Sequence, residues 1–406
     1  MALAGQVVGA LREADWLHPP RIVAWSAVLL LAQTILLAGL IAMWVRHGQQ
    51  VPSDFVSFYA AGKLALSGAP QLAYSQVAHY LAEQHATAAG IQYVFFFYPP
   101  VFLIVCAALA RLPYLVAFVT LQALSLAFYL PVMRRILRAS GWLWCIPVLA
   151  FPSVFWVVGL GQNSFLTAAL FGLGTLLIDE RPVLAGVAFG LICYKPHFGL
   201  LVPVALVAGR RWSAFVAAEA TVAGAAAISI WLFGLAPWRD YLLAMSGSHA
   251  VYESGRIVLA GFVTPFGAAR LMGVPAGPAY AMQIAVALIG AACVFRVWRG
   301  GASLPIRSGV LVAATLLSVP MALLYDLLLI TIAIAWLVRL GRESRYQPWE
   351  KITLLGVYLV PLLSLPLGVA WHVPIGPLAA AAVLVIFLAR FDMGARWPAR
   401  VPALLE

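Results

Sequence analysis

Long stretches without a charged residue place the strongest limit on what this chain can fold into. Four of them, residues 22–45, 113–133, 142–160 and 352–389, match or exceed the roughly 20 residues that a helix needs to cross about 30 Å of hydrocarbon. Only 10% of the residues are charged, against about 25% in an ordinary soluble chain. A soluble globular enzyme, a disordered chain and a coiled coil are therefore excluded. The sequence predicts an all-α, polytopic transmembrane helical bundle.

The sequence shows no division into domains. No polar linker rich in Pro, Gly or Ser separates two kinds of composition, so we predict a single integral membrane domain over residues 1–406. No small-residue cleavage site follows the first apolar stretch, so we expect it to be retained as a span. The cysteines lie in apolar stretches without a CxxC pair, which argues against a disulfide framework and a zinc site. They are Cys106, Cys145, Cys193 and Cys293.

The positions of the basic residues predict the topology. Seven clusters in the loops between apolar stretches hold 18 of the 25 Lys and Arg residues, and short loops rich in these residues stay cytoplasmic. Placing every cluster inside requires an even number of crossings between successive clusters. We therefore predict about twelve crossings with both termini inside, an outer loop over residues 46–112 and a second outer segment over residues 236–273.

The same parity rule assigns the less regular apolar segments. Residues 98–112 become an interfacial or partly embedded helix of the first outer loop, because a span there would place the next Arg cluster outside. Residues 183–211 become a short hairpin whose apex holds Lys195 inside the membrane profile and must be covered by protein or line a cavity. Residues 308–338 and 352–389 form two more hairpins. Three prolines are expected to break the last one, namely Pro366, Pro374 and Pro377.

Charged groups outside the cytoplasmic loops are candidates for function, because a charge in or near a membrane is costly. Asp54 in the first outer loop is one of them. Ser53 or Asp54 could simply cap the following helix with a side-chain oxygen, and this interpretation stays open beside a chemical one. Tyr59 and Tyr98 in the same loop are candidates to line a cavity.

Two turns on the outer side supply further candidates. The turn from Gly161 to Ser164 is expected to cap the next helix through Asn163 or Ser164, in preference to contacting a ligand. Gln162 and Asn163 nevertheless remain candidates to line a cavity. Tyr325 and Asp326, near the turn of the hairpin over residues 308–338, either face the same cavity or cap that turn.

Short motifs follow one another in a set order between residues 20 and 240. They are Ser53-Asp54-Phe55 with Tyr59-Ala60-Ala61, Phe97-Tyr98-Pro99-Pro100, Gly161-Gln162-Asn163, Ala185-Gly186 through Gly190 to Lys195-Pro196, and Arg210-Arg211-Trp212. Each is common by itself, but the ordered set resembles glycosyltransferase family 87.

The resemblance implies a GT-C-type integral membrane glycosyltransferase of the bacterial inner (plasma) membrane. Such an enzyme moves a glycosyl unit from a polyprenyl-phosphate carrier to a lipid or glycan acceptor on the periplasmic or exterior face. Mannose is the first expectation for the sugar and arabinofuranose the second. The family comparison carries a catalytic acidic residue of the first outer loop onto Asp54, which would act as the general base.

The outer loops contain no DxD pair, so we expect neither a metal nor another cofactor, and cations must neutralise the lipid phosphate. Lys195 is the first candidate for this role, because an ammonium inside the membrane profile is stabilised by facing an anion. Its alternatives are to snorkel or to pair with Glu219. The other candidates for the phosphate site are His197, Arg256 and His249.

Two competing functions remain open. A transporter or flippase of a lipid-linked sugar also uses broken helices and intramembrane cations, although most non-cytoplasmic charges here lie in outer loops rather than along a two-sided path. A non-catalytic scaffold is disfavoured by the presence of Asp54. Nucleic-acid binding is excluded as the reason for the net charge of +11, because the basic residues are spread over separate loops.

Overall fold

The computed structural model describes residues 2–46, 53–247 and 257–396, which form helices and no β-strand. The first half contains α1 (Ala2–Glu13), α2 (Pro19–Arg46), α3 (Phe55–Leu66), η1 (Pro70–Tyr74), α4 (Gln76–Ala86), η2 (Pro100–Phe102), α5 (Leu103–Leu109), α6 (Tyr114–Leu137), α7 (Cys145–Leu149), α8 (Pro152–Leu160), α9 (Ser164–Leu177), α10 (Pro182–Gly190), η3 (Leu191–Tyr194), η4 (Pro196–Gly199) and α11 (Val202–Ala208). The second half contains α12 (Trp212–Phe233), α13 (Ala236–Ser246), η5 (Leu259–Gly261), α15 (Pro265–Leu271), α16 (Ala276–Arg299), α17 (Leu304–Ser318), η6 (Asp326–Leu329), α18 (Ile330–Ser344), α19 (Glu350–Trp371) and α20 (Gly376–Arg396).

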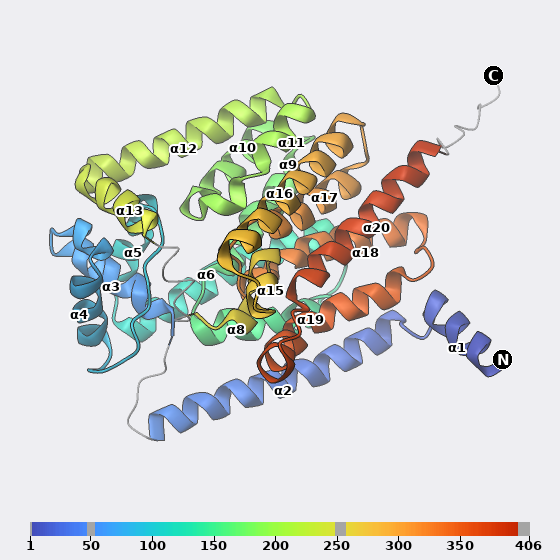
Figure 1. Ribbon diagram of the computed structural model, residues 1–406, viewed down its shortest axis with the longest axis horizontal. Helices are drawn as coiled ribbons and strands as arrows, with labels where there is room; N and C mark the ends of the chain where they lie inside the picture. Colours follow the sequence, from blue (N-terminus) through green and yellow to red (C-terminus); the bar gives the residue numbers. More distant parts are fainter. Residues whose placement is uncertain (1, 47–52, 248–256, 397–406) are drawn as a thin grey trace.

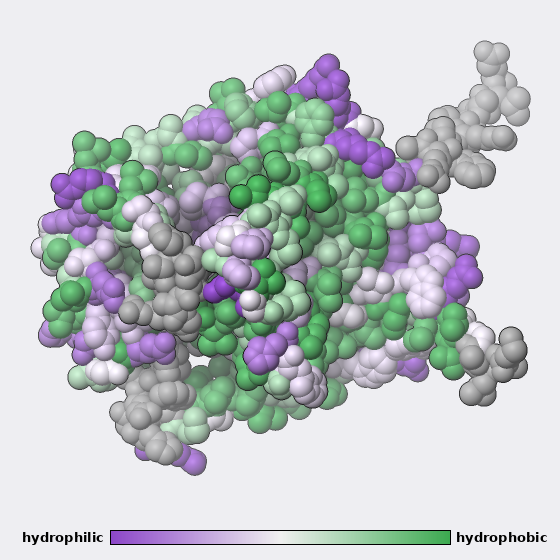
Figure 2. Space-filling view, in the orientation of Figure 1, coloured by the Kyte–Doolittle hydropathy of each residue, from purple (hydrophilic) through white to green (hydrophobic). Residues whose placement is uncertain are grey.

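Six of the described helices are long and apolar enough to cross a membrane. They comprise Pro19–Met43, Tyr114–Leu137, Trp212–Phe233, Ala276–Arg299, Glu350–Trp371 and Gly376–Met393. Figure 2 shows mainly apolar residues across the middle of the visible face and polar residues gathered toward its two ends, the distribution that a bilayer-spanning protein needs. The all-α membrane architecture is therefore confirmed, and the number of about twelve crossings stays a prediction.

Proline positions account for two differences from the expected spans. Residues 142–160, predicted as one span, form the separate helices α7 and α8, because Pro152 cannot continue α7 and instead occupies the start of α8. In the last hairpin, Pro366 does not end the helix, because both Pro361 and Pro366 lie inside α19. The turn comes later, between Trp371 and Gly376.

Residues 98–112 are partly buried in the protein, with Ala108 and Arg111 exposed, and their interfacial position stays a prediction. Pro100 starts η2, as the proline pair predicted, and Leu103 and Cys106 of α5 are fully buried. Helix α5 packs so tightly on α3 that a Cβ on Gly62 would lie 2.1 Å from the carbonyl oxygen of Cys106. Helices α3 and α5 thus pack directly against each other, and Asp54 lies at the start of α3.

Ion pairs join basic loops that are far apart in the sequence. Asp179 pairs with both Arg211 and Arg307, which brings three loops together. Other pairs link Arg138 with Glu343, Arg296 with Asp392, Arg390 with Glu350 and Lys351 with Asp15. Figure 1 shows α1 and the last turns of α20 at one end of the molecule and α3, α4 and α13 at the other.

The hairpin over residues 183–211 forms as predicted. It runs through α10 and η3 to Lys195 and returns through η4 and α11, and at its apex Lys195 is 4% exposed whereas Pro196 is exposed. Two glycines of the motif set explain how α10 approaches α12. A Cβ on Gly186 would lie 2.2 Å from the carbonyl oxygen of Ala214, and one on Gly190 would lie 2.6 Å from that of Ala218.

Candidate active site

Asp54 occupies the N-cap position of α3, but its carboxylate does not cap the helix. The hydroxyl of Ser53 accepts the N–H of Phe55 at 3.2 Å and donates to the carbonyl of Leu160 at 2.7 Å. The capping interpretation is therefore wrong for Asp54. Its Oδ2 instead accepts a hydrogen bond of 2.7 Å from Nε2 of Gln162.

The turn between α8 and α9 delivers Gln162 to this carboxylate. Gly161 has a φ of +67°, and a Cβ there would lie 2.5 Å from the ring of Phe118 and 2.7 Å from Cβ of Phe55. Only glycine suits both the left-handed backbone and this close approach. The start of α3 and the turn are therefore in direct contact.

The rest of this turn does not cap α9 through a side chain, contrary to the prediction. Ser164 donates from Oγ to Oδ1 of Asp326 at 3.3 Å. Asn163 is fully buried against Tyr98, and neither Oδ1 nor Nδ2 of its amide makes a hydrogen bond of standard geometry. The turn therefore bridges two carboxylates, Asp54 and Asp326.

Lys195 pairs with Asp326 inside the protein. Its Nζ lies 2.7 Å from Oδ1, and the two residues are 4% and 6% exposed. Oδ2 of Asp326 also accepts the N–H of Leu323 at 3.3 Å, so Asp326 both caps the turn and faces the site. Lys195 neither snorkels nor pairs with Glu219, whose side chain is exposed on α12. Both alternatives for Lys195 are wrong.

Aromatic rings surround the ammonium group. Nζ of Lys195 lies 6.0 Å from the ring centre of Tyr98 and 5.5 Å from that of Tyr325, within the range of cation–π attraction. The hydroxyl of Tyr98 donates to Oε1 of Gln162 at 3.5 Å. Four motifs that are separate in the sequence, those containing Asp54, Tyr98, Gln162 and Lys195, thus meet at one place.

Electrostatic coupling connects the two acids. Burial raises the pKa of Asp54, the hydrogen bond from Gln162 lowers it, and the nearby charges of Asp326 and Lys195 respectively raise and lower it. Asp54 thus belongs to the same charged cluster as the ion pair. The Lys195 ammonium contacts Asp326 alone and acts on Asp54 only through its charge.

Not every predicted residue joins the cluster. Tyr59 is buried, and its hydroxyl donates to the carbonyl of Leu112 at 2.9 Å, away from Asp54. His197 is partly buried against Phe198 and close enough to Asp326 and Lys195 to interact with their charges. His249 and Arg256 lie outside the described residues. In the part of the chain with coordinates, no three His, Cys, Asp or Glu residues could together hold a metal ion.

Two contributors were not predicted. Gln122, buried in α6, donates from Nε2 to the carbonyl of Gln162 at 3.0 Å. Tyr194 stacks with Tyr98 and Phe102, and its hydroxyl lies 2.6 Å from that of Thr167. An amide in an otherwise apolar stretch, residues 113–133, was a signal that could have identified Gln122. Nothing in the sequence distinguished Tyr194 from the other aromatic residues.

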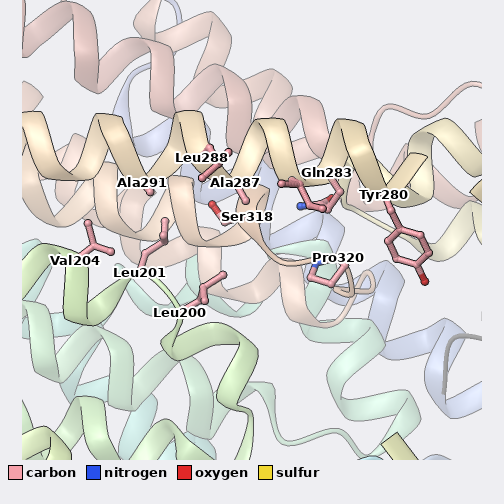
Figure 3. A pocket seen from close by; sticks show the side chains of 11 residues that line it. Leu200, Leu201, Val204, Tyr280, Gln283, Ala287, Leu288, Ala291, Ser318 and Pro320 are labelled. Atoms are coloured by element: carbon pink, nitrogen blue, oxygen red, sulfur yellow. The ribbon is translucent and has the colours of Figure 1, made fainter. Parts of the chain in front are cut away.

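An apolar groove lies between α11 and α16, close in sequence to both members of the ion pair. It has a volume of about 380 Å³, within the range of small-molecule pockets. Figure 3 shows the side chains of both helices pointing toward it. It is lined by Leu200, Leu201, Val204, Tyr280, Gln283, Ile284, Ala287, Leu288, Ala291, Ser318 and Pro320.

Comparison with known proteins identifies the family. The sequence model of glycosyltransferase family 87 matches residues 96–324, which include Tyr98, Gln162 and Lys195. Asp54 and Asp326 lie outside the matched range. Comparisons with curated proteins and with solved structures gave no match. The family match covers more than half of the chain, so this protein, a multi-pass membrane protein by its helices, belongs to glycosyltransferase family 87.

Proposed function

We propose that this membrane glycosyltransferase moves a glycosyl unit, mannose in the first instance, from a polyprenyl-phosphate carrier to a lipid or glycan acceptor on the non-cytoplasmic face. Asp54 is the general base. One observation carries this assignment. The carboxylate lies at a helix start without capping it and belongs to a cluster with a buried ammonium and the family's Tyr, Gln and Lys motifs.

The chemistry needs one base and one cation. Asp54 takes the proton of the acceptor hydroxyl as its oxygen forms a bond to the anomeric carbon. The bond between that carbon and the phosphate oxygen breaks, and polyprenyl phosphate leaves with the electron pair. Lys195 has three N–H donors and uses one for Asp326. It therefore has donors left for the phosphate of the carrier.

The apolar groove supports a lipid-linked donor. Its lining includes Leu200 and Pro320, which are close in sequence to Lys195 and Asp326 respectively, and it extends along α16 to Ala291. Several of its side chains are exposed in the absence of lipid, among them Ile284 and Leu288. We place the first isoprene units of the carrier here, where burial of their CH₂ and CH₃ groups would stabilise the complex.

The test is transfer by the purified protein in lipid nanodiscs. Radiolabelled polyprenyl-phosphate sugars are supplied with total membrane lipid, and labelled product is separated from donor. Asp54→Asn should lower turnover about 10²- to 10⁴-fold, the contribution of a general base. Asp240→Asn, which changes a carboxylate of α13 outside the cluster, should leave turnover unchanged.

Two results would refute the proposal. One is normal turnover by Asp54→Asn. The other is movement of labelled donor across the membrane of sealed vesicles without any product, which would favour the transporter instead.

A further inference from the structure

Gln162 holds only one of the two carboxylate oxygens of Asp54. Its Nε2 donates to Oδ2 at 2.7 Å, and Oδ1 accepts no hydrogen bond from any residue with described coordinates. We propose that Gln162 is a positioning residue of the reaction, which fixes Oδ2 and thereby directs Oδ1 toward the acceptor hydroxyl. This inference rests on the proposed function of Asp54.

The chemistry of the partners fixes the orientation of the Gln162 amide. An ionised carboxylate can only accept, so the NH₂ end of the amide must face Asp54. The opposite end, Oε1, then accepts from the hydroxyl of Tyr98. Both ends of the amide therefore have a partner of matching type, and the side chain has one favourable orientation.

The backbone of Gln162 is held equally firmly. Its N–H donates to the carbonyl of Val157 at 2.9 Å, and its carbonyl accepts from Nε2 of Gln122 at 3.0 Å. Gln162 is 4% exposed, so water does not compete for these bonds. A side chain held at both of its ends and at its backbone can orient a catalytic group, as a loosely held surface side chain cannot.

The surrounding contacts make Gln162 and Asp54 a single unit. They are 108 positions apart, yet the hydroxyl of Ser53 bonds the carbonyl of Leu160 on the other side of Gly161. The missing side chain of Gly161 lets the start of α3 approach the turn. Two contacts, Ser53 with Leu160 and Asp54 with Gln162, therefore fix the angle at which the carboxylate leaves the helix.

The hydrogen bond also acts on proton affinity. It favours the ionised carboxylate and counteracts the burial that raises the pKa of Asp54. A base must be ionised to act, so the acidic limb of kcat/KM follows this pKa. Loss of the Gln162 amide should move that limb to higher pH, because the ionised form loses its donor while burial and Asp326 remain.

Gln33 provides a control for a purely structural role. It lies in α2, and its Nε2 donates to the carbonyl of Ala150 at 3.1 Å. It is a bridging glutamine like Gln162, but its partner is a backbone carbonyl rather than a carboxylate, and it belongs to neither the cluster nor the apolar groove. Gln33→Leu should lower the unfolding temperature without moving the pH profile.

The experiment measures kcat and kcat/KM from pH 5 to 9, together with the unfolding temperature, for the wild type and for Gln162→Leu, Gln162→Met, Gln33→Leu and Asp54→Asn. We expect both Gln162 variants to lose about 10- to 100-fold in kcat, the cost of a misplaced catalytic group, and to show the acidic limb at higher pH. Met fills the volume of Gln with a flexible chain, so it serves if the Leu variant fails to fold.

The outcomes separate the two proposals. An active Asp54→Asn overturns the proposed function. An inactive Asp54→Asn beside Gln162 variants with the wild-type kcat and pH profile overturns the positioning role alone. That role is also overturned if the Gln162 variants lose activity with an unmoved acidic limb, in parallel with their unfolding temperature, as a structural defect would.

Discussion

Lys195 and Asp326 form the most costly contact of the site to disturb. Both are buried, and Asp326 is the one carboxylate in hydrogen-bond contact with the Lys195 ammonium among the residues that have coordinates. Removing one member of a buried ion pair leaves an uncompensated charge, whereas removing both charges avoids that penalty. Stability and function can therefore be separated at this pair.

Lys195→Met should lower the free energy of unfolding by about 3–5 kcal/mol, because Asp326 remains buried without its cation. Adding Asp326→Asn should recover most of that loss, since the amide is neutral and can still accept from Leu323. Glycosyl transfer should stay absent in the double variant, which lacks the phosphate-binding cation. Unfolding in detergent and the transfer assay measure the two properties. A double variant no more stable than Lys195→Met would contradict the ion-pair argument.

A second buried pair, His79 and Glu83, lies in α4 beside α3. Nε2 of His79 lies 3.0 Å from the carbonyl of Ser57, and Oε2 of Glu83 accepts the N–H of Val94 at 3.2 Å. Burial raises the pKa of Glu83 to about 8 and lowers that of His79 to about 4. Burial therefore disfavours the charged form of each side chain.

The raised pKa of Glu83 determines how its contribution to stability changes with pH. From roughly pH 4.5 to 8 the unfolded chain has lost a proton that the folded chain keeps, so this residue's contribution to stability falls as pH rises through that window. Glu83→Gln should remove that fall and leave the opposite contribution of His79, which makes stability rise with pH between about 4 and 6.5. Glu13→Gln, at an exposed carboxylate of α1, should leave the wild-type pH dependence intact. Equal pH dependence in both variants would count against a raised pKa at Glu83.

At the scale of elements, the small residues of the Lys195 motif set how closely two helices pack. Gly186 and Gly190 are four residues apart, so they share one face of α10, and both lie against backbone carbonyls of α12. The sequence motif is therefore a packing surface that holds the hairpin carrying Lys195.

Gly186→Ala should destabilise the protein by about 1–3 kcal/mol, the usual cost of overpacking, because the new methyl group would meet the carbonyl of Ala214. Gly224→Ala is the matched control, since nothing lies within 4 Å of its Cβ position in the same helix pair. It should be neutral or slightly stabilising, as alanine favours a helix over glycine. The measurement is the unfolding midpoint of each variant. An equal loss of stability in the two variants would argue against close packing of α10 on α12 at Gly186.

The sequence predicted helices and hairpins better than it predicted which side chains contact one another. The Lys195 hairpin, the helix start at Pro100 and the hairpin that carries Asp326 all follow from local patterns of apolar residues, prolines and charges. The bond from Gln162 to Asp54 does not, because it depends on how Gly161 lets two distant segments approach. Capping was predicted for Asn163 and Ser164 since it is the local use of such residues, but tertiary contacts override it here.

At the scale of the whole molecule, the ion-paired basic loops and the Asp54 region lie apart. The ion pairs of Asp179, Glu343 and Glu350 join basic loops that the parity rule places together, whereas Asp54 lies with α3 and α4 at the opposite end of the molecule (Figure 1). The cytoplasmic side that the parity rule assigns to these loops stays a prediction. The rule could not fix the number of crossings, since helices such as Ser164–Leu177 are shorter than a bilayer-spanning helix and can end inside the protein.

Labelling of single cysteines tests the orientation. In a variant whose four cysteines are replaced by Ser, Ala88→Cys follows α4 and Ser140→Cys follows the Arg cluster of α6, and both positions are exposed. A membrane-impermeant maleimide added to intact cells should label Ala88→Cys, whereas Ser140→Cys should react only after the membrane is opened. The reverse pattern would place Asp54 in the cytoplasm and remove the proposed reaction from the outer face.

The separation of Lys195 and Asp326 along the chain also has a consequence for biosynthesis. The two residues are 131 positions apart, and ribosomes add about 5–20 residues per second, so Lys195 is made roughly 7 to 26 s before its counter-ion exists. During that interval the α10–α11 hairpin carries an unneutralised ammonium and cannot reach its dry, final state. Synthesis of Asp326, between α17 and α18, is therefore the step that supplies the counter-ion of Lys195, and a nascent chain cut short before it would leave the hairpin with an unpaired charge.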